Sequence, residues 1–437
     1  MSATAERKIG FWMCTALVVG NVIGMGIFLL PASLAPFGFN ALIGWAVTLI
    51  GCLALARVFA CLAHALSGAE GPYVYILCTL GEIPAYVALW AYWASIGPTD
   101  AAFATGIVGY LGAVFPATAA VPPSLLALGL LWMVVAVNLL GVRTGGAVQV
   151  VTTALKLLPM LAIAVLGGWI LLHSPSSYVA HPPSTPISLG AVTTASALAL
   201  FAMIGIESAM VPAARVANPA RTIPRATITG TIATTLIYVV VSAVPLLLIP
   251  QHQLASSGAP LSLLMDRTVG AGTGRWLALF VVISGLGALN GWTLLVAELT
   301  RTMATHGAMP ARLGRLNRFG APAPALLLIG LFSSGMIAMS YSRSLVGAFT
   351  FYSQVVTAAN LPLYLGCVLA LIVLWRRGTV AGTTLTILLP IVVGLLYVCL
   401  AFVGAGVEAT LMMLGLCAAG LPLYAWLRMQ RQRAHEA

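Results

Sequence analysis

Long apolar runs, each about the length needed to cross a bilayer, follow one another along almost the whole chain. A membrane-spanning helix needs about 20 mostly apolar residues. The chain contains twelve such stretches, near residues 10–36, 41–65, 83–114, 122–141, 147–172, 188–212, 226–249, 275–303, 322–341, 345–374, 384–403 and 408–427. Short interfacial helices are expected around 66–82 and 256–273. The pattern predicts an all-α integral membrane protein with a single transmembrane domain over residues 1–437.

Basic residues fall mainly in alternate connections between these stretches. If the amino terminus is cytoplasmic, sixteen of the 20 lysines and arginines lie inside, and only Arg267, Arg275 and Arg343 lie outside. Cytoplasmic loops of membrane proteins are enriched in lysine and arginine. We therefore expect a multi-pass membrane protein with both termini in the cytoplasm.

The composition agrees with this class. Hydrophobic residues make up 61% of the chain and charged residues only 7%, far below the quarter or so typical of soluble domains. The net charge of +11 follows the topology of the loops, so nucleic acid is not an expected partner. The expected surroundings are the lipid bilayer, and a second copy of the chain is a candidate partner.

Two of the predicted spans are interrupted at corresponding positions. The first contains "VVGNVIGMGIFLLP" (18–31), where three glycines surround Asn21, although glycine costs about 1 kcal/mol relative to alanine inside a helix. The sixth contains "FAMIGIESAMVP" (201–212), with Gly205 and Glu207 in an apolar helix. Spans 1 and 6 correspond if spans 1–5 and 6–10 are two repeats. Matched interruptions of this kind indicate an inverted-repeat transporter with a site near the bilayer midplane.

The chemistry of such breaks suggests a ligand. A half-helix beginning near Ile27 presents unpaired N–H groups and a positive dipole end, which suit a carboxylate. Half-helices ending near Gly20 to Asn21 and near Met203 to Gly205 present unpaired carbonyls, which suit an ammonium group. A zwitterionic α-amino acid satisfies both. The alternative is a glycine-packed helix contact or a simple kink.

Three longer segments resemble a known superfamily. They are "GNVIGMGIFLLPASLAPFG" in span 1, "FAMIGIESAMVPAARVANPARTIPRATI" from span 6 into the next loop, and "GALNGWTLLVAELTRTMATHGAMPARLGRLNRFGAP" through span 8. They are similar to the amino acid–polyamine–organocation superfamily, in particular to the bacterial basic amino acid/polyamine antiporters. The resemblance covers about residues 7–430. It implies a leucine-transporter-like 5+5 inverted repeat (about 10–172 and 188–374) with discontinuous helices 1 and 6, plus two carboxyl-terminal helices (about 384–427).

The resemblance also implies a substrate site between spans 1, 3, 6, 8 and 10. Trp292 matches the tryptophan that stacks on the substrate, and Phe201 takes the place of a tryptophan lid. The alternative for each is a packed aromatic side chain. The full set of candidate substrate-binding residues is Asn21, Ile23, Gly24, Met25, Gly26, Ile27, Ile96, Asp100, Phe201, Met203, Ile204, Gly205, Trp292 and Thr357.

Further residues match gating positions of the family. Glu207 corresponds to a proton-sensitive switch, and a charged carboxyl at the midplane costs several kcal/mol, so proton occupancy should couple to the state of the site. The alternative is a neutral acid that ties the broken helices together. Tyr92 and Tyr364 match gating tyrosines, although single aromatic residues are more often packing residues.

Three residues depart from the family pattern. Met25 replaces a serine that would help to hold the carboxylate, so binding there would rest on backbone N–H groups. Asp100 replaces an asparagine, and it would favour a cationic side chain or act as a second proton site; alternatively it faces the outer vestibule.

The third departure is Lys156, within span 5. Proton-coupled and neutral amino acid members of the superfamily carry a lysine there, where sodium lies in the sodium-coupled branch. It would bridge spans 1, 5 and 8 and argues against sodium coupling. The alternative is a lysine that snorkels to the interface.

The remaining polar residues suggest no other chemistry. Glu298 and Arg301, three residues apart, are expected to pair within one helix. The chain has no H-E-x-x-H or G-x-S-x-G motif, and we expect neither a cofactor nor a metal. The sequence thus predicts a secondary active transporter that exchanges a cationic, arginine-like amino acid for its decarboxylated, agmatine-like amine. A proton-coupled or exchange-type permease for neutral amino acids is the alternative, and a polytopic membrane enzyme is a more distant one.

Overall fold

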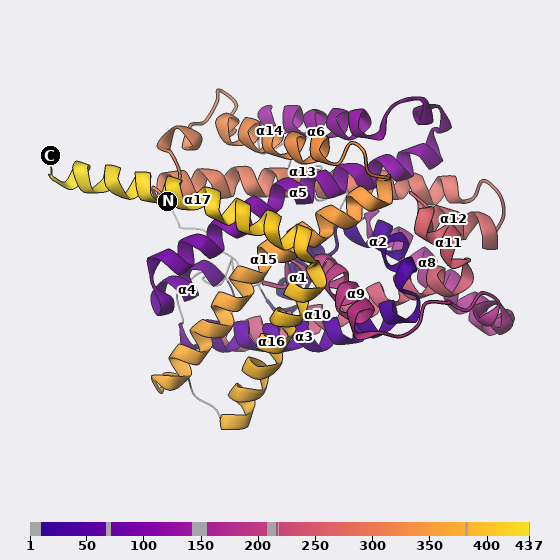
Figure 1. Ribbon diagram of the computed structural model, residues 1–437, viewed down its shortest axis with the longest axis horizontal. Helices are drawn as coiled ribbons and strands as arrows, with labels where there is room; N and C mark the ends of the chain where they lie inside the picture. Colours follow the sequence, from indigo (N-terminus) through magenta and orange to yellow (C-terminus); the bar gives the residue numbers. More distant parts are fainter. Residues whose placement is uncertain are drawn as a thin grey trace, which may run out of the picture.

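The computed structural model describes residues 10–66, 71–141, 155–207, 216, 218–380 and 383–436. Within these ranges the regular structure is helical, without a β-strand (Figure 1). The first part of predicted span 5, up to residue 154, and the end of predicted span 6, residues 208–212, lie outside the described residues.

Six of the helices are long and apolar enough to cross a membrane. The pair α1 and α2 meets the same test as a single span that bends by 52°. Four shorter helices are also apolar, and α5 is a helix of 33 residues. The six are α3 (Phe39–Ala65), α10 (Pro219–Leu248), α13 (Gly274–Thr305), α15 (Leu345–Arg376), α16 (Thr384–Ala405) and α17 (Val407–Glu436). The others are α1 (Phe11–Val22), α2 (Gly26–Leu34), α5 (Glu82–Val114), α6 (Pro123–Leu139), α8 (Leu157–His173), α9 (Leu189–Met203) and α14 (Ala323–Met339).

Each of the twelve predicted stretches overlaps one of these helices or the bent pair, although α8 begins only at Leu157 and α9 already ends at Met203. Three short helices, α4 (Pro72–Leu80), α11 (Gln251–Ser256) and α12 (Pro260–Thr268), lie in or beside the predicted interfacial segments. The structure is thus that of a helical membrane protein, while the arrangement of two inverted repeats of five spans stays a prediction.

The bent pair lies in the middle of the molecule. Every residue of α2 is buried, and α1 and α2 together pack against α9, α10 and α15. Figure 1 shows α5 and α13 side by side, with α6 and α14 along one edge of the molecule and α3 along the other, where α16 crosses α3. By contrast, only 17% of the most apolar stretch of α17 is buried. The interrupted span is therefore part of the core, and α17 lies at the periphery.

The first predicted break is present, with one correction of position; at the second, α9 ends as predicted, and residues 208–215 lie outside the described residues. The first helix continues through Gly20 and Asn21 to Val22, so these two residues lie in its last turn and not at its end. It stops because Ile23 is extended (ψ 99°). The helix α9 ends at Met203, as predicted, and Gly205 follows with φ +113°. This left-handed conformation favours glycine, because a side chain would clash with the backbone there.

Close helix packing elsewhere depends on Gly51 of α3. The ring of Tyr397 on α16 lies so near that a Cβ at Gly51 would be 2.1 Å from its Cγ atom. Gly51→Ala is expected to lower the apparent melting temperature in detergent, because overpacking a close contact costs about 1–3 kcal/mol. Gly112→Ala on α5 is the matched control, since no heavy atom lies within 4 Å of the added Cβ. Equal melting temperatures for the two variants would contradict this packing of α3 against α16.

Candidate functional site

A narrow cavity lies where α1 ends, α2 begins and α9 ends. The helices α5, α10, α13 and α15 complete its wall. Its lining consists of Asn21, Val22, Gly24, Gly26, Ile27, Thr99, Phe103, Phe201, Ala202, Ile204, Tyr238, Trp292 and Val356. The end of α1, the start of α2 and the end of α9 therefore line one cavity.

The amino-terminal side of the break is open to a ligand. The first N–H groups of a helix have no partner within the helix, and α2 begins at Gly26 beside the cavity. In the part of the chain that the structure describes, the N–H groups of Met25, Gly26 and Ile27 meet no acceptor. Three backbone donors at the positive end of a helix are therefore available to an anion.

The carbonyl side of the break is largely satisfied by the protein itself. Lys156 is 4% exposed, and its Nζ donates to the carbonyl oxygen of Gly20 at 2.6 Å and also to that of Ile23. The hydroxyl of Tyr238 donates to the carbonyl oxygen of Val22 at 2.9 Å. Among the last carbonyls of α1, this leaves the one on Asn21, which lies beside Gly205 at the edge of the cavity. An ammonium group thus has fewer acceptors here than the sequence suggested.

The side chain of Lys156 points into the protein, towards the end of α1. It lies just before α8 and reaches the end of α1, so it does not snorkel to a surface. An ammonium group holding two carbonyls stabilises non-helical backbone that would otherwise be unpaired at membrane depth. Lys156 therefore pairs with carbonyls at the end of α1, beside the cavity but not in its lining.

Aromatic rings form the apolar walls. The ring of Phe201 lies 2.7 Å, and that of Phe103 2.8 Å, from where Cβ atoms would stand on Gly26 and Gly24 respectively. Glycine is thus needed at both positions for the rings to approach. Trp292 meets Phe103 edge to face at 6.5 Å between ring centres. These rings suit the aliphatic part of a side chain, and a cation over them would be attracted as well.

Glu207 lies just after the break in the sixth predicted span and connects three parts of the chain. Its Oε2 accepts hydrogen bonds from the Gly205 N–H at 3.2 Å and from the Tyr364 hydroxyl on α15 at 3.1 Å. The side chain of Glu207 is 6% exposed, and Tyr92 of α5 lies close enough to interact with it electrostatically. The geometry is that of an acid tying a broken helix to α15, and it is compatible with a proton-dependent role.

Asp100 is fully buried and is not part of the cavity lining. Its Oδ2 accepts from the hydroxyl of Thr293 on α13 at 3.3 Å, while its Oδ1 has no hydrogen-bond partner among the described residues. Its neighbours on α5, Thr99 and Phe103, line the cavity instead. Asp100 therefore lies one layer behind the wall, and neither of its predicted roles is tested by this arrangement.

The predicted substrate residues divide into two groups. Asn21, Gly24, Gly26, Ile27, Phe201, Ile204 and Trp292 line the cavity, whereas Ile23, Met25, Ile96, Asp100, Met203, Gly205 and Thr357 do not. The side chain of Met25, for example, lies against Gly106 and Gly285, and the hydroxyl of Thr357 donates to the carbonyl of Ala197 at 2.9 Å. Contact of this second group with a substrate stays a prediction.

Sequence reasoning missed six lining residues: Val22, Thr99, Phe103, Ala202, Tyr238 and Val356. Val22 and Ala202 adjoin predicted residues and follow from the breaks. Thr99 and Phe103 lie four residues apart, on one face of α5, and that spacing was the available signal. No comparable signal indicated Tyr238 on α10.

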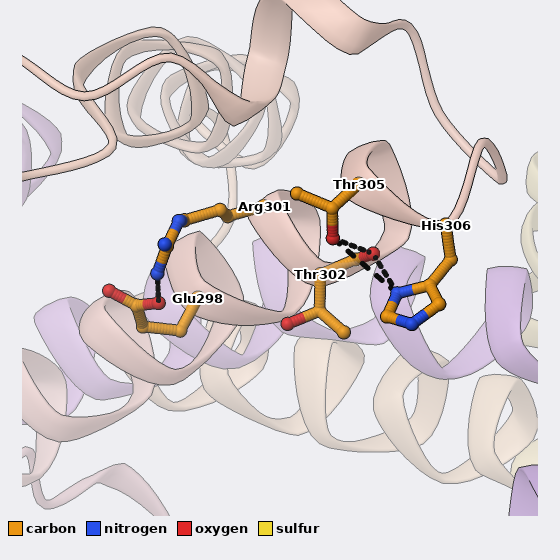
Figure 2. A network of polar contacts seen from close by, with 5 residues as sticks. All are labelled: Glu298, Arg301, Thr302, Thr305 and His306. Carbon is orange, nitrogen blue, oxygen red and sulfur yellow. Dashed lines mark hydrogen bonds and ion pairs between the residues drawn. The ribbon is translucent and has the colours of Figure 1, made fainter.

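The carboxyl-terminal end of α13 contains the predicted pair of charged residues. Figure 2 shows Glu298 and Arg301, whose Oε2 and Nη1 atoms are 3.2 Å apart, next to Thr302, Thr305 and His306. The predicted pairing of Glu298 with Arg301 is confirmed. Neither residue lines the central cavity.

A helical membrane protein with interrupted helices around a cavity for a small molecule belongs to the class of membrane transporters. A family model described as "Amino acid permease" matches residues 9–414, and the chain belongs to this family of the amino acid–polyamine–organocation superfamily. The predicted superfamily is thereby confirmed. The members are transporters, so the enzyme alternative is excluded.

Within this superfamily, the similar proteins are basic amino acid/polyamine antiporters. The putrescine transporter PotE of Escherichia coli (strain K12) is 29% identical over 415 residues, which cover 94% of each chain. The PotE protein of Haemophilus influenzae is 29% identical over 417 residues, again 94% of each chain. The cadaverine/lysine antiporter of E. coli (strain K12) is 32% identical over 338 residues, or 74% of this chain and 73% of the relative.

The Lys156 contacts generate the first functional prediction. Lys156→Ala leaves the carbonyls of Gly20 and Ile23 without their donor, and an unpaired buried acceptor costs about 1–3 kcal/mol. We expect uptake into proteoliposomes to fall by at least about tenfold, with the protein still present in the membrane. Normal uptake by this variant would show that the break holds its shape without the lysine.

Proposed function

We propose that this protein is a secondary active antiporter that exchanges a cationic, arginine-like amino acid for its decarboxylated, agmatine-like amine by alternating access. The observation that carries the proposal is the set of open N–H groups on Met25, Gly26 and Ile27 at the edge of an aromatic-walled cavity. The names of the relatives, a putrescine transporter and a cadaverine/lysine antiporter, support this substrate class.

The proposed binding mode uses both broken helices. The substrate carboxylate accepts hydrogen bonds from the first turn of α2, and its α-ammonium group meets the carbonyl of Asn21 and the last carbonyls of α9. Phe103, Phe201 and Trp292 enclose the side chain, where a cation over an aromatic ring gains about 2 kcal/mol when it is desolvated. The decarboxylated amine would retain the ammonium and ring contacts and lose those with α2.

The proposed topology has twelve spans in a 5+5 inverted repeat followed by α16 and α17, forming a single domain. Both termini lie in the cytoplasm, as the distribution of arginines suggests, and the membrane is the inner membrane of a bacterium. The small buried share of α17 leaves that helix to lipid or to a second copy of the chain.

A transporter of neutral amino acids, coupled to protons or working by exchange, is the second candidate. The buried ammonium group of Lys156 beside the cavity favours it, because a fixed positive charge disfavours a substrate with two cationic groups. The buried carboxyl of Asp100 near the wall acts in the opposite direction. The balance of the two charges sets the substrate charge that the cavity accepts.

Counterflow tests the function directly. Purified protein in proteoliposomes is loaded with an unlabelled amino acid or amine, and uptake of the labelled compound is followed. We expect arginine, lysine or ornithine, and the matching amine, to drive exchange, whereas leucine and alanine do not. Exchange of neutral amino acids alone would establish the second candidate, and no exchange with any of the compounds would refute both.

A second prediction concerns the pH dependence of transport. Glu207→Gln replaces the carboxyl by an amide of similar size. Because the amide cannot take up or lose a proton, the uptake rate should become nearly independent of pH. The comparison is the ratio of uptake rates across pH 5–8 for wild type and variant. Glu298→Gln, which removes a carboxylate far from the cavity, is the control and should keep the wild-type profile. A profile unchanged by Glu207→Gln would contradict the proton-dependent role.

A further inference from the structure

A second site for a charged group lies at the other end of α2 from the break. Two cavities, of about 620 and 690 Å³, share the side chain of Arg343, which lies in the connection between α14 and α15. The guanidinium group is the only charged group in the lining of either cavity.

The larger of these two cavities is aligned with the central cavity along two helices. It is lined by Ala32 and Ser33 of α2 and by Phe351 of α15, whereas the central cavity is lined by Ile27 and Val356 of the same helices. Five residues of helix correspond to about 8 Å. The outer cavity is thus displaced along α2 towards the predicted extracellular side, and a solute moving between α2 and α15 would pass it.

The guanidinium of Arg343 is held in place without using most of its donors. Its Cζ lies 4.2 Å from the ring centre of Phe351, and its Nη2 donates to Oε1 of Glu408, at the start of α17. An arginine has five N–H donors in a rigid fork, and the other four find no acceptor among the described residues. The fork is therefore oriented by the ring and faces open space.

The bond to Glu408 is one that a ligand can replace. The Arg343 side chain is 36% exposed and that of Glu408 is 65% exposed, and ion pairs between exposed side chains contribute little to stability. A free carboxylate offers the guanidinium the same interaction, with a second parallel hydrogen bond if it binds to both arms of the fork.

We propose that Arg343 forms a docking site in the outer vestibule for the carboxylate of the incoming amino acid. The carboxylate takes the place of Glu408 on the guanidinium before the amino acid reaches the central cavity. This proposal rests on the proposed function and on the predicted orientation. An amino acid has the carboxylate, whereas its decarboxylated amine has only positive charge. The site would therefore attract one exchange partner and repel the other on the same side of the membrane. Glu408 balances the charge of Arg343 when the vestibule is empty.

The experiment measures the Michaelis constant for external substrate in right-side-out proteoliposomes with two labelled pairs, lysine with cadaverine and arginine with agmatine. The pair that wild-type protein exchanges is used for the variants. Arg343→Gln should raise KM for the amino acid by at least about tenfold, the lower end of what one charge-assisted hydrogen bond contributes, while KM for the amine stays the same or falls. Glu408→Gln should act in the opposite sense, leaving the amino acid KM the same or lower and raising that of the amine.

Glu298→Gln breaks the other ion pair, at the end of α13, and is the matched control. Its KM values should equal those of wild type. Equal changes for amino acid and amine in Arg343→Gln, or no change for either, would overturn the docking site while leaving the antiporter intact. Absence of exchange by wild-type protein with both pairs would overturn the proposed function and the docking site with it.

Discussion

The structure depends on how backbone N–H and C=O groups are satisfied where a membrane-spanning helix is interrupted. In lipid, an unpaired peptide group has no water to bond with, so a break survives only if other groups replace the lost hydrogen bonds. Here Lys156 and Tyr238 supply donors to the carbonyls of Gly20, Val22 and Ile23. The N–H groups at the start of α2 have no such replacement among the described residues. The break is thus completed by the protein on one side and left for a ligand on the other.

This asymmetry divides two tasks between charged groups. Lys156 donates to two carbonyls at the end of α1, and in the proposed binding mode the solute supplies the anionic group for α2. Glu207 acts on the other interrupted helix, where it joins Gly205 to Tyr364 of α15. Because each broken helix is tied to a different neighbour, movement of α8 or α15 would be transmitted to the cavity through these few polar contacts.

The sequence indicated where helices break better than it indicated which side of an unbroken helix faces the cavity. Glycines and polar residues within apolar runs indicate where a helix stops, so Gly24, Gly26 and Gly205 could be found without coordinates. By contrast, α5 is apolar on nearly all sides, and such a helix has no polar face to show which residues point inward. Asp100 was predicted from the resemblance to the family, and the apolar pattern of α5 did not single out Thr99 and Phe103, which line the cavity. The partners of Lys156 depend on contacts between distant parts of the chain, so the sequence could only suggest the helices involved.

The contact between Phe201 and Gly26 has a consequence for the unloaded carrier. With 2.7 Å between the ring and the position of a Cβ on Gly26, the ring covers the same first turn of α2 that would receive a carboxylate. Solute and ring therefore compete for one surface, so an arriving solute compensates for the contacts that the ring gives up. Without a solute, rotation of the Phe201 ring away from α2 would leave backbone N–H groups without a partner in an apolar cavity. In the proposed antiporter, a first turn of α2 that the ring covers would disfavour return of the empty carrier, and it would favour exchange over uncoupled transport.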